Sequence, residues 1–353
     1  MMQLLSMLAA TALTALCWGL YGPVLHFGRE GMNSALRPFV CVGIAYFLLA
    51  VLIPLTLLTR GGERGGWTRQ GVLWSLLAGC AGALGALGVI LALNFGGKPI
   101  YVMPLVFGGA PVVNTLLNAA MTRSFNQLKA PFLAGLILVI TGAITVLVFK
   151  PQPQPHAPSP AVAVAGEEST PEAAPVEAAP VPHLAAPLEA KGERFLEVLL
   201  SACMALACWG AYGPVLHRGQ AAMGGSRLRP LICIGAAYFL IAVLVPMLLL
   251  GPLGDTGQWN FSGVAWSLAA GALGALGALG TILAFACGGK PFTVMPVVFG
   301  CAPVINTLAT MTLARTPLAT LSPMFLAGLL IVAVGAATVL IFGPRAHAPV
   351  KPA

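Results

Sequence analysis

The amino-acid sequence predicts an all-α integral membrane protein whose ten transmembrane helices form two five-helix repeats of inverted topology. Three observations lead to this fold class: a highly apolar composition, long runs without charge, and a second half that nearly copies the first. Apolar residues make up 58% of the 353 residues and charged residues only 8%, whereas soluble domains average about 25% charged residues. We therefore expect the lipid bilayer, rather than water, to surround most of the chain.

The apolar runs have the length of bilayer-spanning helices, which need roughly 20 apolar residues. They are continuous rather than alternating, which argues against a transmembrane β-barrel. The predicted spans cover residues 3–24, 38–59, 71–95, 99–122, 130–149, 196–216, 230–250, 262–287, 291–313 and 324–343.

The duplication extends over the whole of each half. CWGLYGPVLH at 17–26 returns as CWGAYGPVLH at 208–217, and the segment 96–117 returns at 288–309 with 16 of 22 positions identical. A segment rich in Pro, Ala and Glu, which cannot form an apolar face, separates the copies, and we expect it to be extended and largely disordered. The predicted organisation is a first repeat at 1–150, this linker at 151–192, a second repeat at 193–345 and a tail at 346–353.

An odd number of spans per repeat places the second repeat upside down relative to the first, as in many secondary transporters. Placing both termini inside puts 11 of the 18 Lys and Arg residues inside, in line with the positive-inside bias. The loop at 60–69 carries three arginines and the equivalent loop at 251–260 carries none. We expect a multi-pass protein of the inner or plasma membrane, with cytoplasmic termini and an external linker.

These features resemble those of the EamA-like proteins of the drug/metabolite transporter superfamily. The resemblance rests on the helix count, the inverted duplication, the CWG motif of each first helix and the Pro/Gly-broken fourth helix. It covers nearly everything except the linker and the tail. The near-identity of the halves and the long linker depart from the usual pattern. The resemblance implies transport of a metabolite and does not name the cargo.

The fourth span of each repeat is the leading candidate for a substrate site. Its prolines each remove a backbone hydrogen bond, and irregular backbone at membrane depth is tolerated mainly where it is buried in protein or lines a cavity. A rise of about 1.5 Å per residue places residues 107–111 near the middle of the bilayer. Kinked packing without function is the alternative. The candidate residues are Phe107, Gly108 and Pro111 with their copies Phe299, Gly300 and Pro303.

Duplicated aromatic and amide side chains add further candidates. Stacking on a planar or sugar-like solute competes with interfacial anchoring for the aromatic residues, and ligand contact competes with interhelical hydrogen bonding for the asparagines. The candidates are Trp18, Tyr21, Tyr46, Trp209, Tyr212, Tyr238, Asn114 and Asn306.

The ends of the helices provide candidates for the two mouths of a pathway. His26 and Lys98 are expected outside, and His217 and Lys290 inside. Snorkelling anchors are the ordinary reading of such lysines, whereas attraction of an acidic solute is the functional one.

Several functional classes are disfavoured. All ten acidic residues lie in loops, in the linker or at helix ends, so carboxylate-based proton coupling is not expected. We expect no enzyme activity, cofactor, metal site or nucleic-acid partner. The favoured function is a facilitator or exchanger that moves a small polar metabolite by alternating access at a midplane site. A non-transporting scaffold or sensor and a flippase for lipid-linked substrates are the alternatives, and a homodimer is left open.

Overall fold

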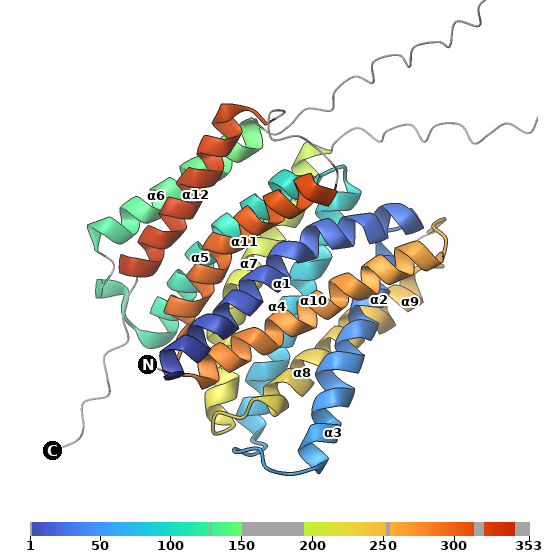
Figure 1. Ribbon diagram of the computed structural model, residues 1–353, viewed down its shortest axis with the longest axis vertical. Helices are drawn as coiled ribbons and strands as arrows, with labels where there is room; N and C mark the ends of the chain where they lie inside the picture. The colour runs from blue at the N-terminus through green and yellow to red at the C-terminus, as the bar shows by residue number, and fades with distance from the viewer. Residues whose placement is uncertain (1, 128, 150–193, 252–254, 314–320, 343–353) are drawn as a thin grey trace, which may run out of the picture.

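The computed structural model describes residues 2–127, 129–149, 194–251, 255–313 and 321–342 (Figure 1). Every regular element within these ranges is helical. The predicted linker and the predicted tail lie outside the described residues.

The helices follow the duplication in the sequence. The first half contains α1 (Met2–Met32), α2 (Leu36–Tyr46), η1 (Phe47–Leu52), α3 (Ile53–Thr59), α4 (Arg69–Asn94), α5 (Pro99–Thr122), η2 (Phe125–Gln127) and α6 (Ala130–Val148). The second half contains α7 (Phe195–Ala222), α8 (Leu228–Tyr238), η3 (Phe239–Leu244), α9 (Val245–Leu249), α10 (Phe261–Ala286), α11 (Pro291–Leu313) and α12 (Pro323–Phe342).

Local sequence explains where several helices begin. The side chain of Thr68 accepts a hydrogen bond from the backbone N–H of Gly71, and the side chain of Asn260 accepts one from Gly263. These are N-caps, which satisfy donors that the first helical turn leaves free. Helices α5 and α11 instead begin on proline, whose missing N–H costs nothing at that position.

The second span of each half contains a short π-helical stretch, η1 and η3. At its end the N–H of Ile53 bonds the carbonyl of Leu48, five residues earlier, rather than four. The adjacent residue Pro54 has no N–H and its ring excludes the carbonyl four residues before it, which favours a widened turn here. Such π-bulges are rare and often lie at functional sites. The bulge follows directly after Tyr46 in η1 and after Tyr238 in η3.

Eight helical segments are long and apolar enough to cross a membrane, with α2–α3 and α8–α9 each counting as one. They are compatible with a multi-pass membrane protein. Helices α6 and α12 are also apolar, but their apolar segments are shorter by the same measure. Large apolar side chains such as Ile137 and Ile144 on α6 are more than half exposed, which suits contact with lipid rather than water.

The two halves interlock rather than fold as separate bodies. Helix α1 packs along α10, and α7, its copy, packs along α4 (Figure 1). Both pairs are antiparallel: Gly28 of α1 lies against Ser267 near the start of α10, and Thr14 donates a hydrogen bond of 3.2 Å to the carbonyl of Gly277 further along it. Most of the core is therefore built between the halves.

Equivalent helices also pack on each other in antiparallel pairs. The end of α5 reaches the start of α11, because Asn114 bonds the carbonyl of Pro291, and Asn306 of α11 bonds the carbonyl of Pro99. Helices α6 and α12 lie side by side (Figure 1), with Gly328 of α12 against Val146 of α6. The asparagine contact is therefore made twice, once by a residue of the first half and once by its equivalent in the second half, as in an approximate twofold arrangement.

Candidate functional site

A small, largely enclosed cavity lies where the two halves meet. The space open to the centre of a water molecule is about 20 Å³, which is room for roughly one water molecule. Each residue of its lining has its repeat equivalent in the lining as well. The lining residues are Trp18, Tyr21, Tyr46, Gly82, Trp209, Tyr212, Tyr238 and Gly274. We call this site the aromatic chamber; six of these residues are the aromatic candidates that the sequence singled out.

Glycines on α4 and α10 bind the indole N–H groups of the two chamber tryptophans and leave room for their rings. The indole N–H of Trp18 donates to the carbonyl of Gly274 at 3.3 Å, and that of Trp209 donates to the carbonyl of Gly82 at 3.1 Å. One turn further along each helix, a Cβ on Gly277 or Gly85 would overlap the indole ring. The tryptophans are thus fixed by backbone of the opposite half.

The four chamber tyrosines complete the lining. Tyr46 and Tyr238 stack face to face with ring centroids 3.6 Å apart. Tyr21 meets Trp209 edge-on at 5.9 Å, and Tyr212 meets Trp18 in the same way at 5.6 Å. The two edge-on contacts have the preferred geometry of aromatic pairs, whereas the face-to-face stack of Tyr46 on Tyr238 is closer than the usual range of about 4.5–7 Å.

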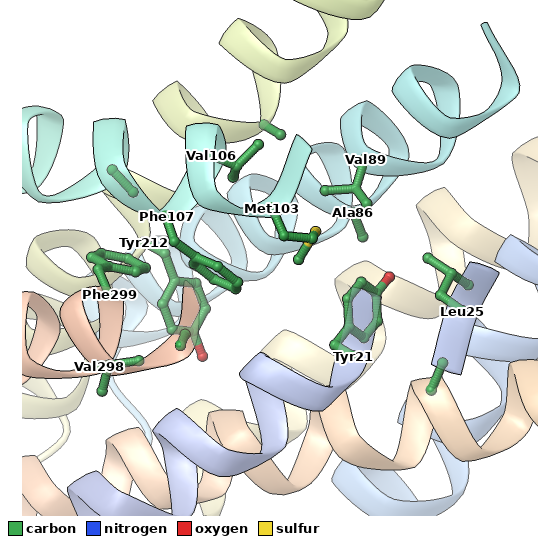
Figure 2. Packing of buried hydrophobic residues seen from close by; sticks show 14 of the residues in the cluster. Tyr21, Leu25, Ala86, Val89, Met103, Val106, Phe107, Tyr212, Val298 and Phe299 are labelled. Carbon is green, nitrogen blue, oxygen red and sulfur yellow. The ribbon is translucent and has the colours of Figure 1, made fainter. Parts of the chain in front are cut away.

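Phe107 and Phe299 close the chamber from α5 and α11. Their centroids lie 6.1 Å apart, and both side chains are fully buried. Phe107 stacks on Trp209 at 5.6 Å and Phe299 on Trp18 at 6.4 Å. Figure 2 shows both phenylalanines beside Tyr212. These two candidates therefore belong to the same aromatic cluster, although they do not line the cavity itself.

The other candidates of the fourth spans face elsewhere. A Cβ on Gly108 would meet Val332 of α12 and Val139 of α6. Gly300 lines a separate apolar groove between α11 and α12. Pro111 and Pro303 are buried within their helices and do not line the chamber. Counting residues along the fourth spans did not give the direction in which these side chains face.

Asn114 and Asn306 join the fourth spans of the two halves. Both are fully buried, and their side-chain amides donate to Pro291 and Pro99 at 3.3 and 3.0 Å. Each bond holds one helix end to the first residue of its antiparallel copy. The amide N–H groups of the two asparagines thus have a structural role, whereas their side-chain oxygens have no hydrogen-bond partner among the described residues.

Replacing Asn306 by alanine is expected to lower the free energy of unfolding by about 1 kcal/mol, the usual worth of one such hydrogen bond. Asn114→Ala is expected to cost a similar amount. Unfolding in mixed micelles at rising dodecyl sulfate content measures this, with the exposed Asn126→Ala as control. Equal stabilities of Asn306→Ala and the control would show that the bond contributes nothing.

The basic candidates lie at the ends of the helices. His26 pairs with Glu30 on the same helix at 3.1 Å, and the ring of His217 meets Phe285 edge-on at 5.2 Å. Lys98 and Lys290 are exposed. Lys290 lies near enough to His217, and Lys98 to Glu30, to interact electrostatically.

Two ion pairs between the halves were missed by sequence reasoning. Arg229 pairs with Glu63 at 2.9 Å, and its repeat equivalent Arg37 pairs with Asp255. All four side chains are at most 15% exposed. We call these the Glu63 clasp and the Asp255 clasp.

Each clasp is reinforced by its surroundings. Glu63 also accepts a hydrogen bond of 2.6 Å from the backbone N–H of Leu228, at the start of α8. The guanidinium of Arg229 lies 5.9 Å from the Trp67 ring centre, and that of Arg37 lies 5.7 Å from the equivalent Trp259. The repeated spacing of acid, Trp and Arg in the two halves is the signal that would have revealed them.

Within the described residues, no group of three or more His, Cys, Asp or Glu side chains is placed to hold a metal ion. No protein-family model matches the chain, and no curated protein matches it.

Proposed function

We propose that the protein is a transporter that moves a small solute by alternating access, with the aromatic chamber as the solute site. One observation carries this proposal: a largely enclosed cavity is lined by matched residues from two halves that meet in antiparallel pairs. In inverted-repeat transporters the site lies near the midplane between the repeats, and the halves rock around it. Membership of the EamA-like proteins, suggested by the sequence, is part of the proposal.

The topology of the proposal has ten spans, with α6 and α12 as the fifth and tenth. The antiparallel packing of α5 on α11 and of α6 on α12 supports opposite orientations of the two repeats. With both termini in the cytoplasm, the Glu63 clasp lies on the cytoplasmic side. The Asp255 clasp then lies on the outer side, because an odd number of spans separates the two loops.

The clasps fit a role as the two gates. Each joins the halves at one end of the molecule, and both are closed in this structure. A largely enclosed chamber between two formed clasps fits the occluded state of an alternating cycle. Opening of one gate exposes the chamber to one side only.

Flux through liposomes tests the function. Purified protein is expected to give saturable uptake of at least one member of a panel of sugars, nucleobases, amino acids, organic acids and their amides. Empty liposomes and protein unfolded before reconstitution are the controls. Absence of saturable uptake across the whole panel would favour a scaffold or sensor instead.

The linker supplies a second test of where transport resides. Deletion of residues 155–190 is expected to leave uptake per folded protein unchanged, because the chamber and both clasps lie within the helical core. Uptake is compared in liposomes at equal amounts of reconstituted protein. A loss of uptake in a deletion variant that still elutes as a single species would contradict this.

A further inference from the structure

The polar atoms of the aromatic chamber are tyrosine hydroxyls. Those of Tyr21 and Tyr212 are buried without a hydrogen-bond partner in the described part of the chain. Both lie close enough to Tyr46 and Tyr238 to interact with them electrostatically. A buried polar group without a partner is costly. These two hydroxyls therefore provide hydrogen-bonding capacity that a ligand or a water molecule can use.

The chamber tryptophans offer only ring faces and edges. Their N–H groups are already bonded to the glycine carbonyls of the opposite half. The rings of Trp18, Phe299 and Tyr212 meet at right angles or in stacks, as do those of Trp209, Phe107 and Tyr21. Aromatic side chains of this kind stack on flat rings, and saturated rings offer no such π-face.

Charge argues for an uncharged ligand. Among the described residues, no charged side chain lines the chamber, so an ion would leave water without gaining a counter-charge. The ends of the helices carry more basic than acidic groups: Arg29 and Lys98 lie near Glu30 at one mouth, and Lys290 lies near His217 at the other. This balance disfavours the approach of cations. An anion attracted to a mouth would meet hydroxyls and aromatic rings inside, but no positively charged side chain among the described residues that line the chamber.

We propose that the solute of the aromatic chamber is an uncharged, planar aromatic or heteroaromatic molecule. Its ring stacks on Trp18 and Trp209, and its polar edge bonds the hydroxyls of Tyr21 and Tyr212. This inference rests on the proposed function and specifies its substrate class. Because the largely enclosed cavity holds about 20 Å³, the rings lining it must separate to admit such a solute.

Binding to purified protein in nanodiscs tests this without requiring flux. Three uncharged aromatic probes, nicotinamide, adenine and indole, are compared by calorimetry. Close analogues of nicotinamide isolate each property: 1-methylnicotinamide is a cation, nicotinate is an anion, and cyclohexanecarboxamide is uncharged but not planar. At least one uncharged aromatic probe is expected to bind saturably, and each of the three analogues at least tenfold more weakly than nicotinamide or not at all.

The variant Tyr21→Phe/Tyr212→Phe tests the two hydroxyls while keeping both rings. It is expected to weaken binding of the best probe roughly tenfold, which corresponds to about 1.4 kcal/mol. Tyr101→Phe, a buried tyrosine outside the chamber, is the matched control and is expected to bind as the parent does. Elution as a single species confirms that each variant is folded.

Three results would overturn the substrate class: no saturable binding of any uncharged aromatic probe, binding of 1-methylnicotinamide, nicotinate or cyclohexanecarboxamide as tight as that of nicotinamide or tighter, or unchanged binding by the double tyrosine variant. These results leave the proposed function standing if liposomes show saturable uptake of another solute. Absence of both binding and uptake across all panels would reject the function itself.

Discussion

Replacing Arg229 by alanine is expected to lower the free energy of unfolding by about 3 kcal/mol, and Arg37→Ala is expected to do the same. Each change leaves a carboxylate, Glu63 or Asp255, that is at most 13% exposed and has lost its ion-pair partner. Removing one member of a buried pair typically costs this much, because the other charge stays desolvated. Unfolding of the purified variants in mixed micelles with dodecyl sulfate measures the loss.

The exposed pair Arg194–Glu197 is the matched control for this prediction, since its side chains are 48% and 34% exposed. Arg194→Ala is expected to leave stability unchanged, as for most surface ion pairs. A double-mutant cycle with Glu63→Gln is expected to show coupling, so that Glu63→Gln/Arg229→Ala costs less than the sum of the single changes. Strict additivity would show that the Glu63 clasp contributes no interaction energy.

Replacing Gly85 by alanine is expected to lower the free energy of unfolding by about 2 kcal/mol. The new Cβ would overlap the indole of Trp209, whose hydrogen bond to Gly82 would be strained or lost. Overpacking of this kind typically costs about 1–3 kcal/mol, and the strained hydrogen bond adds to that cost. Alanine is a better helix former than glycine by about 1 kcal/mol, which offsets part of the destabilisation. Gly277→Ala, which meets Trp18 in the same way, is expected to give the same result.

Gly66→Ala is the control for the glycine variants, because no heavy atom of the described residues lies within 4 Å of the position where its Cβ would be. Tryptophan fluorescence reports the predicted displacement directly, since Gly85→Ala should shift the emission and Gly66→Ala should not. A Gly85→Ala protein as stable as the parent, with unchanged emission, would contradict the close packing of Trp209 on Gly85.

The helical fold and its division into two similar halves were predictable, because the apolar runs and the repeat can be recognised directly in the sequence. The duplication identified equivalent residues, and six of the aromatic candidates line one cavity. The third spans carry a stripe of glycines that packs closely against the opposite half: Gly82 meets Tyr238 and Gly274 meets Tyr46. In lipid, a stripe of small residues lets a helix approach its neighbours closely, so close packing is the expected outcome.

Other features depend on three-dimensional arrangement and were not predictable from the sequence. The depth of Gly108 and Gly300 follows from counting residues, but the helix face that they occupy depends on how α5 and α11 pack on α6 and α12. Glu63 and Asp255 resemble ordinary loop charges until the interlocked halves bring Arg229 and Arg37 to them. The π-helical turns after Tyr46 and Tyr238 likewise left no mark in the apolar pattern.

Access to the chamber from the two sides of the membrane tests alternating access between inverted halves most directly. A single cysteine replaces Tyr21 in a protein whose eight native cysteines have been replaced, and a small membrane-impermeant thiol reagent is applied to one side at a time. Breaking the Glu63 clasp with Glu63→Gln is expected to speed labelling from the cytoplasmic side only. Breaking the Asp255 clasp with Asp255→Asn is expected to speed it from the outer side only. Faster labelling from the same side in both variants, or no change in either, would contradict the proposed mechanism.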